Sequence, residues 1–98
     1  MFVRIWRFEA RAGKAAQFRA AYGSNGSWTD LFRRGAGYLG TEFLESTGDP
    51  AFYVTVDRWE SADAWAAFLR EWSDDYAALD RTCEELTLAE EEIGTFSG

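Results

Sequence analysis

The spacing of hydrophobic residues changes along this chain in a fixed order, and that order limits the folds open to it. Residues 2–9 alternate with the two-residue period of a strand, and residues 14–22 carry apolar side chains at helical spacing. Two strand patterns follow at residues 38–45 and 52–59, then a helical stripe that reaches residue 86 and a last strand at residues 87–96. The β-α-β-β-α-β order predicts an α+β, ferredoxin-like sandwich with a four-stranded antiparallel sheet. A length of 98 residues predicts that residues 1–98 form a single domain.

Turn and cap residues interrupt both helical segments. Residues 23–26 have the composition of a loop, and Ser27 after them has the pattern of a helix N-cap. The first connection is therefore expected to be a broken helix. Ser61 is expected to cap the second helical segment, and Ser73 followed by two aspartates predicts a second start and a kink near residue 73.

The charge of the chain is acidic and unevenly distributed. The net charge is −7, with seven Lys and Arg against five Asp and Glu in residues 1–50, and three against twelve in residues 51–98. Nucleic-acid binding requires a basic surface, so we expect no nucleic-acid partner. No apolar run is long enough to cross a bilayer, and the first residues enter a strand pattern without a signal sequence. These features predict a cytoplasmic protein with no membrane partner.

The strands are apolar on both of their faces. Alternation is expected to set Val3 and Ile5 against Trp6 and Phe8, Leu39 and Phe43 against Tyr38 and Leu44, and Val54 and Val56 against Tyr53 and Trp59. Two helical segments cover one face of such a sheet and leave the other bare. Burial of the bare face against a second copy of the chain avoids an exposed apolar sheet, so we expect a homodimer.

Aromatic residues make up 17% of the chain, and they are the best candidates for a binding site. Six of them are expected to wall a cavity for a planar aromatic ligand: Trp6, Tyr22, Trp28, Phe32, Trp65 and Tyr76. The short helix that starts at Ser27 is expected to be the lid of this cavity. The alternative is that each of the six belongs to the core. Three arginines lie inside strands, namely Arg4, Arg7 and Arg58, and Arg58 is a further site candidate. Each is either a donor to a phenolate or enolate oxygen or the ion-pair partner of Glu42, Asp57 or Glu9.

The chain contains no histidine and one cysteine, Cys83. A Ser or Cys triad and a metal site of the usual His or Cys type are therefore not expected. The glycines match no phosphate-binding spacing, and Glu90, Glu91 and Glu92 alternate between the faces of a strand, so they do not converge on a cation. We expect no metal and no other cofactor.

Three segments resemble the antibiotic biosynthesis monooxygenase (ABM) family of dimeric α/β-barrel proteins. They are Val3-Arg4-Ile5-Trp6-Arg7-Phe8, Ala36-Gly37-Tyr38-Leu39-Gly40-Thr41-Glu42, and Asp57-Arg58-Trp59-Glu60-Ser61 with Ala64 and Phe68 downstream. The resemblance implies a cavity between sheet and helices. It also implies one of two activities. Polyketide-tailoring members of the family use the cavity to oxidise a polycyclic phenol or anthrone with O₂, without metal or flavin. Other members degrade haem and use a His on the second helix as its axial ligand.

The resemblance leaves two functions open for a chain without histidine. The first is a cofactor-independent monooxygenase that acts on a polycyclic aromatic or phenolic, polyketide-type metabolite, with Tyr, Asp or Glu in place of the usual base. The second is a non-catalytic, or isomerase- or cyclase-type, dimeric protein that binds a small hydrophobic ligand. The haem-degrading activity is not expected, because its axial ligand is missing.

Overall fold

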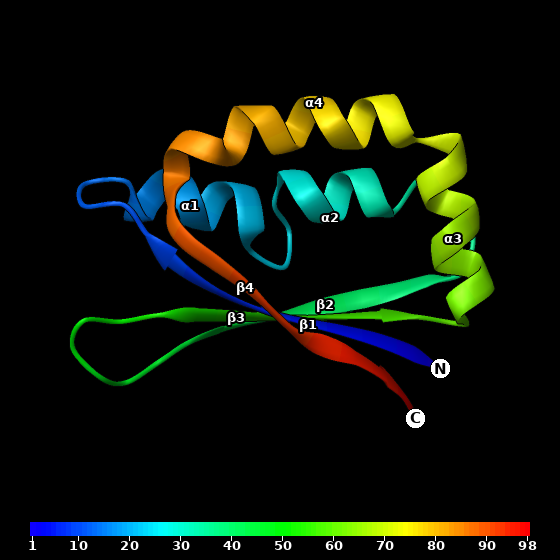
Figure 1. Cartoon of the computed structure of the whole chain (residues 1–98), viewed down its shortest axis with the longest axis horizontal. Helices are drawn as coiled ribbons and strands as arrows, with labels where there is room; N and C mark the ends of the chain where they lie inside the picture. The colour runs from blue at the N-terminus through cyan, green and yellow to red at the C-terminus, as the bar shows by residue number, and fades with distance from the viewer.

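A computed structural model describes residues 1–98 and places the elements in the expected order (Figure 1). The strands are β1 (Phe2–Ala10), β2 (Tyr38–Glu45), β3 (Tyr53–Trp59) and β4 (Thr87–Ser97). The helices are α1 (Ala15–Tyr22), α2 (Ser27–Phe32), α3 (Ala62–Glu71) and α4 (Ser73–Cys83), followed by a 3₁₀ turn at Glu84–Leu86. None of the helices is both long and apolar enough to cross a membrane.

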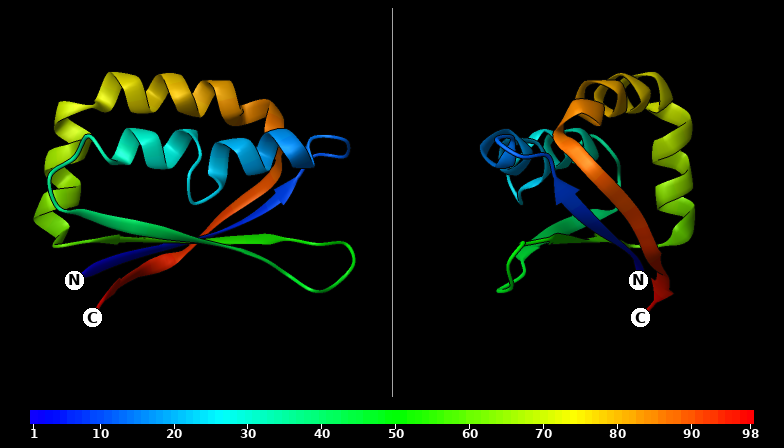
Figure 2. Two further views of the ribbon diagram at one scale, coloured as in Figure 1. Left: turned by 180° about the vertical axis from the view of Figure 1, so that it is seen from behind. Right: turned by 60° about the vertical axis from the view of Figure 1, so that its left-hand side comes forward.

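The four strands form one antiparallel sheet in the order β2-β3-β1-β4. This is the order of a ferredoxin-like fold, so the predicted fold class is confirmed. All four helices lie on one side of the sheet, and the opposite side carries no helix (Figures 1 and 2).

Strand β3 shows how the sequence builds the core. Every second side chain is buried, namely Tyr53, Thr55, Asp57 and Trp59, while Val54, Val56 and Arg58 between them are half-buried. The buried set faces the helices, and its two aromatic members join one apolar cluster that includes Phe8, Phe18, Trp28, Phe32 and Phe68. Two polar residues, Thr55 and Asp57, are thereby placed inside an aromatic core.

A β-bulge in β2 overturns one expectation about the strand faces. Tyr38 pairs with Trp59, and Gly40 pairs with Arg58, the residue before Trp59 in β3. Leu39 is therefore an extra residue without a partner. Gly40 has φ of 140°, a conformation that favours glycine. The bulge brings Tyr38 onto the same face as Phe43, because Phe43 and Tyr38 pair with Thr55 and Trp59 of one β3 face. Leu39 does not share that face and is 54% exposed, so the predicted grouping of Leu39 with Phe43 is wrong.

The predicted caps are right for one of the helices. The Ser61 hydroxyl accepts a hydrogen bond from the backbone N–H of Ala64 and caps α3. The expected kink is also present, because α3 and α4 are separate helices that meet at Trp72. Ser27 is not a cap: Gly26 occupies that position, and the Thr29 hydroxyl donates to the Gly26 carbonyl instead.

Candidate functional site

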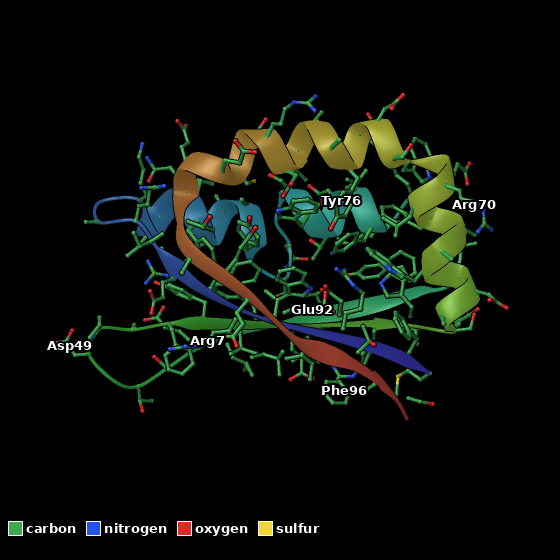
Figure 3. All side chains as sticks on the ribbon, viewed as in Figure 1. Arg7, Asp49, Arg70, Tyr76, Glu92 and Phe96 are labelled. Atoms are coloured by element: carbon green, nitrogen blue, oxygen red, sulfur yellow. The ribbon has the colours of Figure 1, made fainter.

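A cavity opens between the inner face of the sheet and the helices. Together with its open mouth it holds about 520 Å³ of space, and it is lined by Arg4, Trp6, Phe8, Tyr22, Trp28, Thr29, Phe32, Thr41, Thr55, Asp57, Tyr76, Asp80 and Glu90. Figure 3 shows Tyr76 reaching from α4 into the space above the sheet.

Strand β1 sets the length of the cavity. Arg4, Trp6 and Phe8 are alternate residues of β1 and all three line the cavity. At about 3.3 Å per residue, Arg4 and Phe8 are about 13 Å apart along the strand. Trp6 lies between these two residues, beside the middle of the slot.

A buried ion pair lies at one end of the slot. The Arg4 guanidinium is 3.5 Å from Asp57 Oδ2, and the two residues are 6% and 5% exposed. Arg4 also stacks on the Trp65 ring, with its Cζ 3.8 Å from the ring centroid. At 3.5 Å the ion pair is longer than a good hydrogen bond, so the guanidinium retains capacity for a ligand oxygen.

Asp57 has the properties of a buried acid–base group. Burial raises the pKa of its carboxyl, and the hydrogen bond from Thr41 and the charge of Arg4 oppose the rise without cancelling it. The Thr41 hydroxyl donates to Asp57 Oδ1 at 2.6 Å. A carboxylate whose pKa is moved upward toward neutral pH is a stronger base than an exposed one. Asp57 is therefore the candidate proton acceptor in a chain that has no histidine.

The other end of the slot is acidic. Asp80 of α4 and Glu90 of β4 line it, and Glu90 lies opposite Phe8 in the sheet. Burial raises the pKa of Glu90, and the charges of Asp80 and Glu84 add to the rise. Burial likewise raises the pKa of the Tyr22 phenol above its ordinary value, so Tyr22 remains neutral and can donate a hydrogen bond.

Indole N–H groups supply further donors along the slot. Nε1 of Trp6 and Nε1 of Trp28 are buried and have no hydrogen-bond partner. The Trp28 indole lies near the Tyr22 hydroxyl and opposes the rise of its pKa, but it makes no hydrogen bond of good geometry to that oxygen. The Trp6 N–H is thus the clearer free donor, since an unpartnered buried N–H is costly without a ligand.

Five of the seven residues predicted for the site line the cavity: Trp6, Tyr22, Trp28, Phe32 and Tyr76. Trp65 does not, because it lies behind Arg4 and packs on Trp59 and Phe68. Arg58 does not either: it follows Asp57 in β3, so it points to the opposite face, where it forms an ion pair with Glu42.

The structure also corrects the expected lid. Trp28 and Phe32 are 7% and 4% exposed and belong to the buried cluster. They are walls of the cavity and parts of the core at once, and α2 is not a loosely attached cover.

The sequence offered Arg4 as an ion-pair partner or as a hydrogen-bond donor to a ligand oxygen, and Asp57 as an ion-pair partner. The pairing of Arg4 with Asp57 is observed, as are those of Arg7 with Glu9 and of Arg58 with Glu42. The place of Asp57 in the cavity was missed. The signal was available, because strand alternation places Asp57 on the face of Tyr53 and Trp59.

The residues present do not fit an iron or haem ligand set. No three His, Cys, Asp or Glu side chains lie close enough together to hold a metal ion. Cys83 is 2% exposed and does not line the cavity. Burial raises the pKa of the Tyr76 phenol, and Arg4, which lies beside it, opposes that rise.

Comparison with solved structures finds the same fold in proteins of low sequence identity. SnoaB, a cofactor-independent oxygenase from Streptomyces nogalater, matches with a TM-score of 0.80 and 20% identity over 99% of this chain and 91% of SnoaB. The haem degrader MhuD from Mycobacterium tuberculosis matches with a TM-score of 0.66 and 20% identity, over 100% of this chain and 95% of MhuD. At such identities the likeness is one of fold.

Sequence comparison gives the family. A search of proteins with curated functions finds no match. The family model for antibiotic biosynthesis monooxygenases matches residues 1–80, which is most of the chain and includes the strands that carry Arg4, Thr41 and Asp57. The resemblance seen in the three sequence segments is thereby confirmed: the chain belongs to the antibiotic biosynthesis monooxygenase family.

Proposed function

We propose that the protein is a cofactor-independent monooxygenase that oxidises a polycyclic phenolic or anthrone-type metabolite, with Asp57 as the general base. The observation that carries the proposal is the position of Asp57: a buried carboxyl of raised pKa, beside a buried arginine, at the end of an aromatic slot. Membership of the monooxygenase family supports it, as does the shared fold with SnoaB.

The chemistry needs few protein groups because the substrate supplies the electrons. Asp57 removes a proton from the activated carbon of the substrate and leaves an electron-rich carbanion, whose charge spreads onto the ring oxygen. Arg4 and the free N–H of Trp6 stabilise that oxygen. The carbanion then transfers electrons to O₂, and a carbon–oxygen bond forms to give a peroxide.

The second half of the reaction breaks the peroxide. Its O–O bond is cleaved with loss of water, and the carbon becomes a carbonyl. In sum, a CH₂ group and O₂ yield C=O and H₂O, so two hydrogens leave the substrate and no external reductant is consumed. With substrate in the slot, the aromatic walls keep bulk water away, which strengthens the interactions of Arg4 and Asp57 with the charged intermediate.

We also propose that the working unit is a homodimer formed through the bare side of the sheet. Val3, Ile5, Val54 and Val56 are half-buried there in the single chain, and Phe96, which pairs with Val3, is 47% exposed. Figure 3 shows Phe96 on the side away from the helices. An apolar face of this kind is typical of an interface between copies.

Turnover of 9-anthrone tests the function. The expected result is O₂ uptake with formation of anthraquinone faster than in buffer, followed by absorbance and an oxygen electrode. Asp57→Asn should lower kcat about 100-fold or more, because the base is lost, whereas Asp49→Asn on the exposed hairpin should leave it unchanged. Wild-type turnover by Asp57→Asn would remove Asp57 from the mechanism. Anthrone binding without O₂ uptake would instead support the alternative function of a hydrophobic ligand-binding protein.

A further inference from the structure

We propose that Thr41 and Tyr38 form a proton relay that connects Asp57 with solvent at the edge of the sheet. The inference rests on the proposed function and concerns how the base is reset between turnovers. Thr41 and Tyr38 are positioning residues in this scheme, since they act on the substrate only through Asp57.

The relay is a continuous chain of short hydrogen bonds. Asp57 Oδ1 is 2.6 Å from the Thr41 hydroxyl, and that hydroxyl is 2.6 Å from the Tyr38 hydroxyl. An ionised carboxylate can only accept, so the Thr41 proton points to Asp57. The Thr41 oxygen then accepts from Tyr38, which makes Tyr38 the donor of the second bond. Both hydrogen bonds thus point inward, from Tyr38 to Thr41 and from Thr41 to Asp57.

The chain of hydroxyls leads from the interior to the edge of the sheet. Asp57 lies on β3 and is 5% exposed, whereas Tyr38 and Thr41 lie on β2, an edge strand, and are partly exposed. In a regular strand, residues three apart point to opposite faces. The bulge at Leu39 and Gly40 cancels this offset and brings both hydroxyls to the cavity face.

The other groups around the relay leave this path to Asp57 Oδ1. Arg4 of β1 faces Oδ2, and Tyr76 of α4 lies beside Arg4. The charge of Arg33, which follows α2, acts on Tyr38 and opposes the rise of its pKa. A ligand in the slot excludes water from the cavity side of Asp57. The Tyr38 side therefore provides the route by which the buried carboxyl exchanges its proton with solvent.

The proton transfer balances without an ion left on either hydroxyl. The proton on Asp57 moves to the Thr41 oxygen as the Thr41 proton moves to the Tyr38 oxygen, and the Tyr38 proton passes to water. Asp57 becomes a carboxylate and one hydronium ion forms outside. Rotation of the two hydroxyls restores the starting order, and the reverse sequence delivers a proton to Asp57.

Three substitutions test the relay with little change of shape. Tyr38→Phe removes the outer hydroxyl and keeps the ring that packs on Phe32 and Trp59. Thr41→Val removes the inner hydroxyl, and Thr41→Ser retains it. The titration of the Asp57 carboxyl, followed by ¹³C NMR, is the readout that requires no turnover. We expect Thr41→Val to raise the pKa of Asp57, Tyr38→Phe to raise it by a smaller amount, and Thr41→Ser to match the wild type.

Turnover of 9-anthrone is the second readout. Tyr38→Phe and Thr41→Val should lower kcat about 10-fold with little change in KM, and Thr41→Ser should restore it, because only a hydroxyl can pass a proton. Wild-type kcat in Tyr38→Phe, or an Asp57 titration that Tyr38→Phe leaves unchanged, overturns the relay. If the wild type fails to oxidise anthrone, the proposed function fails on its own, and the NMR titration still decides whether Tyr38 and Asp57 are coupled.

Discussion

At the scale of single residues, the unusual feature is the burial of Asp57. A carboxyl inside an aromatic core loses its hydration, and Arg4 at 3.5 Å and Thr41 at 2.6 Å compensate for only part of that loss. The pKa of Asp57 is raised as a result. Buried acids that weaken the fold are common at functional sites, because the same environment makes them effective in proton transfer.

This environment predicts a pH dependence of stability that Asp57→Asn removes. Asp57 has an ordinary pKa of 3.8 and a higher one in the folded chain. Its contribution to stability is therefore fully present below pH 3.8 and is lost as the pH rises through the folded-state value. Urea unfolding across this pH range should show the free energy of unfolding of the wild type falling relative to that of Asp57→Asn. A difference between the two proteins that is constant with pH would contradict the assigned shift.

Strand alternation in the sequence was enough to place Asp57 on the inner face, although its role was not read from that pattern. The position of Trp65 relative to the cavity was harder to predict. The apolar stripe of a helix shows which face is buried, but it does not show which side chain lies between that face and the cavity. Here that side chain is Arg4. Five of the six aromatic candidates line the cavity, since a short chain with this many aromatic residues gathers them on the covered side of one sheet.

At the scale of elements, the order of periodicities predicted all four strands to within a residue or two. The bulge in β2 was not predicted, because the position of one unpaired residue depends on the register with β3 and not on local spacing. Gly40 was the only local sign of it. Its φ of 140° and the open space around its missing side chain show that backbone conformation, and not crowding, requires glycine there.

Gly40→Ala should consequently lower stability by about 1–3 kcal/mol through backbone strain. Gly48→Ala is the matched control, because Gly48 also has open space around it but does not have a positive φ. Urea denaturation of both variants measures the difference. Equal stability of the two would show that the bulge does not depend on Gly40.

At the scale of the whole molecule, helices cover one side of the sheet and leave the other apolar and bare (Figure 2). The strand pattern supports the dimer proposed for that side. On this side β1 and β3 carry Val3, Ile5, Val54 and Val56, and the charge of Arg58 is paired with Glu42.

Sedimentation at micromolar concentration should give twice the mass of one chain. Val56→Asp places a charge at the centre of the bare side, opposite Ile5, and should shift the protein to a monomer. Ala77→Asp adds the same charge at an exposed position of α4 and should leave the dimer intact. A monomeric wild type, or a dimer that survives Val56→Asp, would show that the bare side is not the interface.

The bulge in β2 also affects how the protein resists aggregation. β2 and β4 are the two edges of the sheet, and an edge strand offers unpaired N–H and C=O groups to any other extended chain. Both edges are irregular: β2 at Leu39, and β4 at two register shifts against β1. Irregular edges cannot template a straight partner strand. The bulge at Leu39 and Gly40, which brings Thr41 to the cavity face, thus also makes the edge of β2 a poor site for fibril growth.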